Sequence, residues 1–266
     1  MLRQVRIPTN ALRERAAQLL ESPDALSQDA FGICGMAAVV YVLLKTNPTG
    51  AVDLLSQLFG GGRDLSTATD GDPRAQNQLM RYYTKAKPRE AKYQLDFLLC
   101  RYIGVLMERD APELFARQEK FTRDLAAALK GGGDDPLDMT AGNLAIHFDG
   151  MKWMVDRYLW AGKSKELKVS SSWPSAEPLA TMAAIVTATR DHYVISAQDL
   201  QELTEPLFTH WVVLLDAAAV PQGGINPSVK WRPSEFSRGS VVKYDGITLS
   251  EQELRRFYPR MIMADT

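Results

Sequence analysis

Cysteine is scarce in this sequence: only Cys34 and Cys100 occur among its 266 residues. Two cysteines cannot form a disulfide framework, so the chain is not a small secreted domain stabilised by cross-links. At this length a hydrophobic core is large enough to stabilise one large domain or two modest ones without such help.

An excess of either charge is also absent. The sequence has 31 Lys and Arg residues against 32 Asp and Glu residues, for a formal net charge of -1. Because a general nucleic-acid-binding domain carries a basic excess, this balance argues against nucleic acid as a partner. We interpret the basic, tyrosine-containing tract Arg81–Tyr93 as a solvated helix face in preference to a surface for RNA or an acidic partner.

No segment of the sequence is apolar for long enough to span a membrane as a helix. The longest such run, Phe31–Leu44, has 14 residues, whereas a spanning helix needs about 20. The run also begins too far along the chain, behind charged residues, to be the apolar part of a signal peptide. We therefore expect no membrane insertion and a cytoplasmic location where the chain is synthesised.

Motifs for metal, phosphate and serine chemistry are missing as well. The glycine triplets at 60–62 and 131–133 lack the Lys-Ser/Thr of a phosphate-binding loop, and no Gly-x-Ser-x-Gly elbow occurs. Neither His147 nor His192 has the neighbours of a metal site. The sequence thus predicts no cofactor and no metal. His147 and Asp149 have two interpretations, a catalytic pair or the polar face of an alternating strand.

Hydrophobic periodicity and turn residues predict helices first and strands mainly later in the chain. The predicted helices are Asn10–Glu21, Cys34–Lys45, Ala51–Phe59, a mostly helical tract Gln76–Lys130, Pro178–Arg190 and Glu251–Phe257. The predicted strands are Leu144–Phe148, Lys168–Trp173 and Trp211–Leu215, followed by a hairpin over Ser240–Thr248. This order predicts an α+β fold, with a helical N-terminal lobe over about 10–135 and a β-rich C-terminal lobe over about 140–266.

Cys34 stands where a reactive thiol is expected, at the start of a predicted helix. A helix N-terminus favours thiolate over thiol, and its backbone N–H groups can hold an oxyanion. A cysteine within an apolar helix is otherwise a small buried hydrophobe, which is our interpretation of Cys100. Cys34 is therefore the candidate nucleophile.

A thiolate nucleophile needs an imidazole base, and His210 is the candidate. His210 opens the strongest predicted strand, and a strand edge is a rigid support for an imidazole. A third group must orient the ring through its other nitrogen. Asn226 and Asp216 are both available for this role, and we prefer Asn226.

These residues and their neighbours stand in a recurring order. Gln28 precedes Cys34 by six positions, and Cys34 is followed by Gly35. Asn226, which precedes a proline, follows His210 by 16 positions. In this order and spacing the chain resembles the papain-like cysteine hydrolases, a superfamily that includes the peptidase domains of bacteriocin exporters and several bacterial effector and toxin enzymes.

The resemblance implies a single papain-like catalytic domain over 1–266 that hydrolyses an amide bond in a protein or peptide. It implies that Gln28 and the Cys34 backbone N–H bind the oxyanion. His210 is the implied general acid and base, oriented by Asn226. It further implies an effector or toxin that is exported without a cleaved signal and inhibited by a cognate immunity protein. The alternatives are a non-catalytic papain-like interaction module and a peptidoglycan amidase.

Overall fold

The structure is a computed structural model, and the residues that it describes fall into two compact units. The described residues are 9–27, 33–59, 73–86, 94–129, 144–168, 181–186, 208–221, 229–237, 240–243, 250 and 260–264. The first unit spans Met1–Leu159 with Arg238–Ser240, and the second spans Trp160–Ser237 with Val241–Thr266. That the whole chain forms one catalytic domain stays a prediction.

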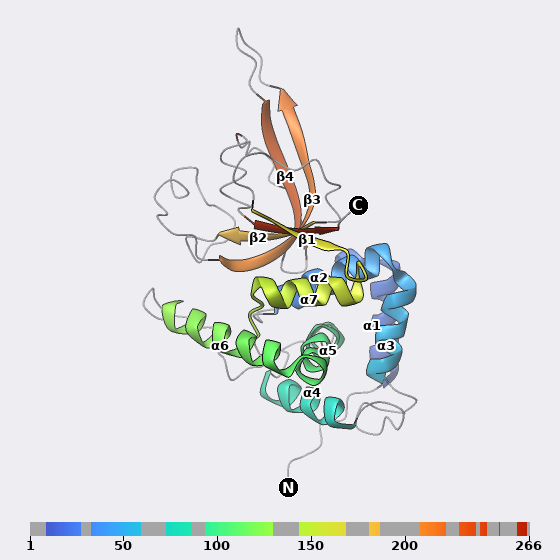
Figure 1. The fold of residues 1–266 in the computed structure, drawn as a ribbon. Helices are drawn as coiled ribbons and strands as arrows, with labels where there is room; N and C mark the ends of the chain where they lie inside the picture. The colour runs from blue at the N-terminus through green and yellow to red at the C-terminus, as the bar shows by residue number, and fades with distance from the viewer. Residues whose placement is uncertain are drawn as a thin grey trace. The chain divides into compact units, whose positions relative to one another are not determined.

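The first unit contains seven described α-helices and one short 3-10 helix (Figure 1). They are α1 (Thr9–Glu21), η1 (Pro23–Ala25), α2 (Cys34–Thr46), α3 (Pro48–Phe59), α4 (Pro73–Ala86), α5 (Gln94–Asp110), α6 (Pro112–Leu129) and α7 (Phe148–Tyr158). Three of the helices, α3, α4 and α6, begin at a proline. Proline suits a first helical position because an N–H group there would have no acceptor within the helix, and because the proline ring fixes φ at a helical value.

Helix α5 is the centre of this unit. Every residue from Leu95 to Met107 is buried, and α5 packs against α1, α2, α3, α4 and α6. Apolar side chains surround most of its circumference, which is the pattern of a helix enclosed by other helices. Helix α2 is likewise buried over Gly35–Leu44, so the remaining helices supply most of the surface of the unit.

A buried ion pair joins α1 to α5. The Asp96 carboxylate, which is fully buried, accepts hydrogen bonds from Arg15 Nε at 2.9 Å and Arg15 Nη2 at 2.7 Å. The same carboxylate accepts the Ser27 N–H at 2.8 Å, and Arg15 Nη2 also donates to the Ala25 carbonyl at 2.7 Å. Asp96 and Arg15 thus fix the segment that follows η1 against two helices.

The strands form one six-stranded sheet in the order β1-β6-β2-β3-β4-β5. Their bounds are β1 (Ser164–Lys168), β2 (Thr181–Val186), β3 (Phe208–Pro221), β4 (Val229–Ser237), β5 (Ser240–Lys243) and β6 (Arg260–Ala264). The pairings of β1 with β6, β2 with β6, β2 with β3 and β3 with β4 are antiparallel. In register, Met182 lies opposite Val213 and Asp216 lies opposite Ser234.

The predicted fold class, a papain-like α+β fold with a β-rich C-terminal lobe, is wrong. The part of the protein whose side-chain packing is described is predominantly helical, and its core is the helical core around α5. The strands add only Trp211–Leu214 and Ile262 to the described buried residues. The apolar faces of the helices cover one another, so the described core does not consist of a sheet and the helices packed on it.

Several individual predictions in the helical part are confirmed. Helices α1 and α2 match the predictions Asn10–Glu21 and Cys34–Lys45, and α3 contains the predicted Ala51–Phe59. The tract Gln76–Lys130 is helical in its described parts. These segments combine helical periodicity with clear proline or glycine boundaries, which are strong sequence signals.

Two predictions are wrong in type. The predicted strand Leu144–Phe148 is an extended segment that leads into α7. It is not a strand of the described sheet, because its Ala145 and His147 N–H groups donate to side chains of α6. The predicted helix Pro178–Arg190 contains strand β2, which pairs on both sides. The predicted strand at 211–215 lies within β3, which confirms it.

Other predictions are only partly covered by the structure. Ser240–Lys243 of the predicted hairpin is strand β5, and its Asp-Gly turn lies outside the described residues. The predicted helix Glu251–Phe257 and most of the predicted strand Lys168–Trp173 also lie outside them.

Candidate functional site

Cys34 is the first residue of α2 and is partly exposed. It takes part in no disulfide. The residue before it, Ile33, has no side-chain capping hydrogen bond, and intrahelical bonding begins with the Ala37 N–H donating to the Ile33 carbonyl at 3.0 Å. The first N–H groups of a helix have no acceptor within the helix. Cys34 therefore stands at the end of α2 where an anion is favoured.

Cys100 differs from Cys34 in its burial. It is fully buried in α5, and burial, together with the nearby charge of Asp96, raises the pKa of its thiol well above the ordinary value. Such a thiol stays protonated and packs as a small apolar group. The interpretation of Cys100 as a core residue is confirmed.

The other predicted site residues are described incompletely. His210 lies in β3 opposite Ile185, and Asp216 lies in the same strand, but the side chains of both are outside the described part. Gln28 and Asn226 lie outside the described residues altogether. Cys34 belongs to the first unit and His210 to the second, so their pairing stays a prediction.

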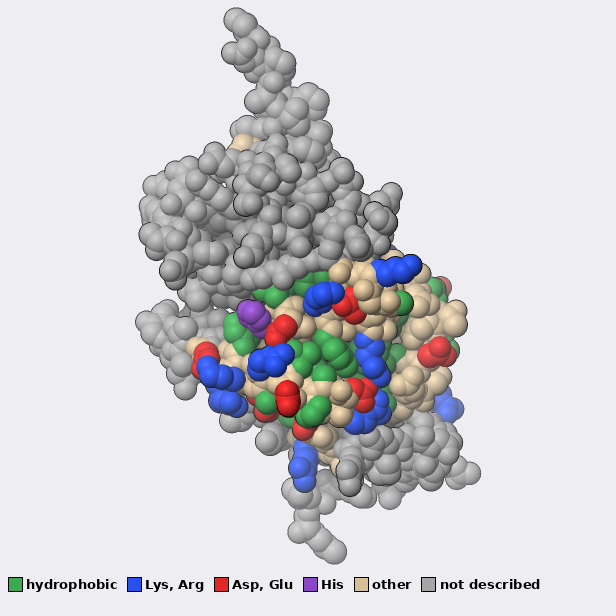
Figure 2. Space-filling view, in the orientation of Figure 1, with side chains coloured by type: hydrophobic (Ala, Val, Ile, Leu, Met, Phe, Trp, Pro, Cys, Tyr) green, Lys and Arg blue, Asp and Glu red, His purple; other side chains and the backbone are tan. Residues whose placement is uncertain are grey.

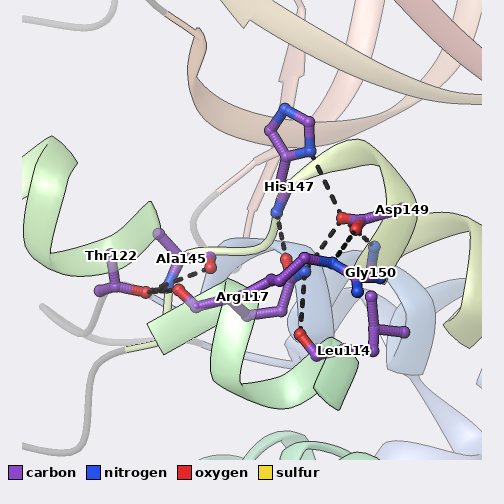
Figure 3. A network of polar contacts seen from close by, with 8 residues as sticks. Leu114, Arg117, Thr122, Ala145, His147, Asp149 and Gly150 are labelled. Carbon is purple, nitrogen blue, oxygen red and sulfur yellow. Dashed lines mark hydrogen bonds and ion pairs between the residues drawn. The ribbon is translucent and has the colours of Figure 1, made fainter. Parts of the chain in front are cut away.

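A polar network at the start of α7 was not predicted from the sequence. The extended segment before this helix is tied to α6 by two buried side chains, Gln118 and Thr122 (Figure 3). Gln118 Oε1 accepts the His147 N–H at 2.7 Å, and Thr122 Oγ1 accepts the Ala145 N–H at 3.0 Å. These two bonds replace the ladder that a strand partner supplies, and they hold His147 at the N-cap position of α7.

Asp149, in the first turn of α7, gathers most of the hydrogen bonds of this network. Its Oδ1 accepts the Gln118 Nε2–H at 3.0 Å and the Gly150 N–H at 2.9 Å, and lies 3.3 Å from His147 Nδ1. Its Oδ2 accepts the Arg117 Nε–H at 3.0 Å. Partial burial opposes ionisation of the carboxyl, but the hydrogen bonds from Gln118, Arg117, Gly150 and His147 outweigh it and lower the Asp149 pKa.

The carboxylate also decides the tautomer of His147. An ionised carboxylate only accepts hydrogen bonds, so Nδ1 of the imidazole carries the proton that faces Asp149. In the neutral ring, Nε2 is then the atom with a lone pair. This is the arrangement by which a carboxylate prepares an imidazole to accept a proton.

The imidazole of His147 is accessible. Its side chain is 47% exposed, and its ring meets the rings of Phe121 and Phe148 edge to face, with centroids 5.1 and 5.6 Å away. Figure 3 shows the ring projecting from the side of the segment away from Thr122. His147 is the one histidine whose side chain is described.

The start of α2 packs against this network. A Cβ placed on Gly35 would lie 2.9 Å from Ile146 Cβ and 3.3 Å from Met151 Cε, so only glycine allows this close approach. Gly35 follows Cys34, and Ile146 precedes His147. Contacts between α2 and α7 continue from there. Cys34 and His147 are thus each the sequence neighbour of one residue of the Gly35–Ile146 contact, and both belong to the first unit.

Sequence reasoning identified His147 and Asp149 but left their role open. An alternating strand is excluded, because the two residues occupy the N-cap and first turn of a helix. Their supports, Gln118 and Thr122, had no recognisable signal: both are single polar residues on a helix, and their burial follows from tertiary packing alone.

The remaining surface features are of mixed character. The face of the helical unit in Figure 2 has basic and acidic side chains interspersed around apolar ones, without a patch of one sign. Within the described ranges, no group of three or more potential metal ligands occurs. None of the described helices has the length and apolar character required to cross a membrane.

Comparisons of the chain with protein-family models, with curated proteins and with solved structures find no significant match.

Proposed function

We propose that this protein is a cysteine-dependent amide hydrolase, of the protease or glutamine deamidase type, with Cys34 as its nucleophile. The observation that carries the proposal is the difference between the two cysteines. Cys34 begins α2 and is partly exposed, whereas Cys100 is enclosed in the core. Reactive cysteines are found in accessible positions that favour the thiolate, and structural cysteines are buried.

In the proposed reaction the Cys34 thiolate attacks an amide carbonyl, and the oxyanion is held by the Cys34 N–H and the Gln28 side chain. A histidine, predicted from the sequence to be His210, protonates the departing amine as the C–N bond breaks. The same imidazole then accepts a proton from water, and the resulting hydroxide hydrolyses the thioester. Asn226, with Asp216 as the alternative, orients the imidazole ring.

The proposed substrate is a protein or a peptide, and the reaction requires no cofactor. The mixed charges on the face of the helical unit shown in Figure 2 support a protein partner over nucleic acid. The resemblance to bacterial effector enzymes supports a toxin made in the cytoplasm, exported without a cleaved signal and inhibited by a cognate immunity protein.

The proposal is tested by comparing Cys34→Ala with Cys100→Ala, a matched loss of the buried thiol. A protein mixture is incubated with each variant, and new peptide N-termini and released ammonia are measured. Cys34→Ala should be inactive, Cys100→Ala should retain activity in its folded fraction, and Gln28→Ala should lose about 10²–10³ in rate. Wild-type activity in Cys34→Ala overturns the proposal. Toxicity that appears only when the protein is directed to the periplasm favours the alternative, a peptidoglycan amidase, over a cytosolic target.

A non-catalytic interaction module is the second candidate, and the packing of Gly35 favours it. The close contact of Gly35 with Ile146 buries the residues that directly follow Cys34, and a cysteine at the edge of a core can serve packing alone. This function predicts that Cys34→Ala binds its partner as the wild type does, and that neither protein hydrolyses an amide.

A further inference from the structure

The helical core contains an arginine whose hydrogen-bond donors are not all satisfied. Arg101 of α5 is only 1% exposed. Its Nε and Nη1 are buried and make no hydrogen bond within the described part of the chain. A guanidinium stays charged in proteins, so burying it with unpaired donors is costly. Such groups are rare in folded proteins, and functional sites are where this kind of local conflict is expected.

Aromatic rings and a glycine hold the Arg101 guanidinium in place. Its Cζ lies 3.7 Å from the centroid of the Tyr82 ring of α4 and 6.0 Å from that of the Phe115 ring of α6. These are cation–π contacts. A Cβ on Gly104 would collide with Nη1, so the side chain passes over Gly104, where only glycine leaves room. The guanidinium is therefore fixed where α4 and α6 pack on α5 (Figure 1).

The inner side of this position is apolar. The same Cβ on Gly104 would lie 3.1 Å from Met36 Sδ of α2 and 3.3 Å from Leu144 Cδ2. Neither side chain offers a good acceptor for a charged donor. An acceptor for Arg101 must therefore come from another direction.

A carboxylate oxygen on the same face of α5 also lacks a partner. Glu108 follows Arg101 by seven positions, or about two helical turns, with Gly104 between them on that face. Its Oε2 is buried and makes no hydrogen bond to the described residues. Burial lowers the pKa of Arg101, and the nearby Tyr82, Glu108 and Glu119 offset this only in part. A cationic donor and an anionic acceptor are thus neighbours that do not bond each other.

A ligand that satisfies both groups must carry both charges. Its carboxylate would accept hydrogen bonds from Arg101, and its ammonium group would donate to Glu108. A simple anion would be repelled by Glu108, and a simple cation by Arg101. An α-amino acid has a carboxylate and an ammonium group on a single carbon atom, which is the required combination.

We propose that Arg101 and Glu108, together with Tyr82, form a binding site for a free α-amino acid. Tyr82 and Glu108 are partly exposed, whereas Arg101 is buried. The ligand therefore reaches Arg101 past these two side chains, without unfolding of α5. The site does not include Cys34, so it is independent of the proposed hydrolase.

The test is thermal unfolding of the full chain in the presence of each common L-amino acid, followed by titration calorimetry for those that raise the midpoint. A ligand raises the midpoint because it binds only the folded state. For each binder we compare the analogue without the amino group and the analogue without the carboxylate. Both should bind at least about tenfold more weakly, because each leaves one charge of the site unpaired.

Two variants separate the two charges. Arg101→Met should weaken binding by about 10- to 100-fold. Without ligand, its unfolding midpoint should equal or exceed that of the wild type, because an apolar side chain replaces an unpaired buried charge. Arg15→Met is the matched control, since Arg15 has a carboxylate partner; it should lower the midpoint and keep binding in its folded fraction. Glu108→Gln should bind the analogue without the amino group as tightly as the amino acid.

The proposal is overturned if no amino acid raises the midpoint, or if binding is unchanged in Arg101→Met. Equal binding of the amino acid and of its analogue without the amino group, in the wild type, would indicate an adventitious ion only. A midpoint that falls as far in Arg101→Met as in Arg15→Met would mark Arg101 as a structural cation. Glu108→Gln then decides, because this partly exposed residue can change with the fold intact: an unaltered preference for the amino acid overturns the site.

Discussion

Replacing Asp96 with asparagine is expected to destabilise the helical unit by about 3–5 kcal/mol, the cost of breaking a buried ion pair. The Asp96 carboxylate is fully buried and accepts three N–H groups, two from Arg15 and one from Ser27. Asparagine keeps one acceptor oxygen and turns an NH₂ toward these donors. The Arg15 side chain, only 11% exposed, is then left without a carboxylate.

The loss is measured by urea denaturation followed by far-ultraviolet circular dichroism. A domain has about 5–15 kcal/mol of stability in total, so this substitution removes a large share of it. At about 2–4 °C per kcal/mol for a unit of this size, the midpoint of thermal unfolding should fall by about 10 °C.

A double variant separates the charge effect from the loss of shape. Arg15→Met combined with Asp96→Leu removes both charges and leaves two main-chain groups without these partners, the Ser27 N–H and the Ala25 carbonyl. Leaving a neutral polar group unpaired costs about 1–3 kcal/mol when it is buried, which is less than leaving a buried charge unpaired. The double variant should therefore be more stable than Asp96→Asn alone. A cost below about 1 kcal/mol for Asp96→Asn, or additive effects of Arg15→Met and Asp96→Leu, would refute this account of the ion pair.

Three further predictions concern α7 and its surroundings. Gly150→Ala should destabilise the unit by about 1–3 kcal/mol, because its Cβ would meet Gln118 Oε1 at 2.6 Å; thermal unfolding checks this, and an unchanged midpoint contradicts it. Because the pKa of Asp149 is lowered in the folded state, its contribution to stability is present above the ordinary value of 3.8 and is lost as the pH falls through the lowered pKa. The urea midpoint of Asp149→Asn should therefore change less than that of the wild type between about pH 5 and pH 2, and equal changes would exclude this linkage. Burial raises the pKa of the Tyr158 hydroxyl to about 12, so stability should fall as the pH rises above the ordinary tyrosine value of 10.0. Tyrosinate absorbance in an alkaline titration should show one fewer late-titrating group in Tyr158→Phe, and an unchanged late step would show that Tyr158 titrates normally.

The helices were predictable because their signals are local. The run Cys34–Lys45 and the tract Gln76–Lys130 combine apolar periodicity with breaks at proline and glycine, and the chain is helical in their described parts. The central position of α5 was not predicted. Enclosure on all sides depends on which helices surround α5, and this is a property of the tertiary structure.

The segment before α7 shows why the local pattern failed there. Leu144, Ile146 and Phe148 alternate with more polar residues, as in a half-buried strand, and all three are buried. The alternation is real, but the segment is extended because Gln118 and Thr122 accept its N–H groups. A pairing of backbone with distant side chains leaves no periodic trace in the sequence.

The candidate site was predictable only in its reactive groups. Cys34 was singled out by its position at a helix start and His210 by its position at a strand start, whereas the role of His147 with Asp149 was left open. The contact of Gly35 with Ile146 joins two segments more than 100 residues apart in the sequence. Such a contact is not encoded in the spacing of residues along the chain. The packing of the segment before α7 against the start of α2 was therefore not predictable from the sequence.

The enclosure of α5 has a consequence for how the protein opens. Amide protons exchange with solvent only when their hydrogen bonds break, and a helix covered on all sides cannot break them by local fraying alone. The amides from Leu95 to Met107 should therefore exchange last, at the rate of global unfolding of the unit. Their exchange measures the full free energy of the unit without denaturant, whereas exchange at the start of α7 measures the local opening of the segment that carries His147.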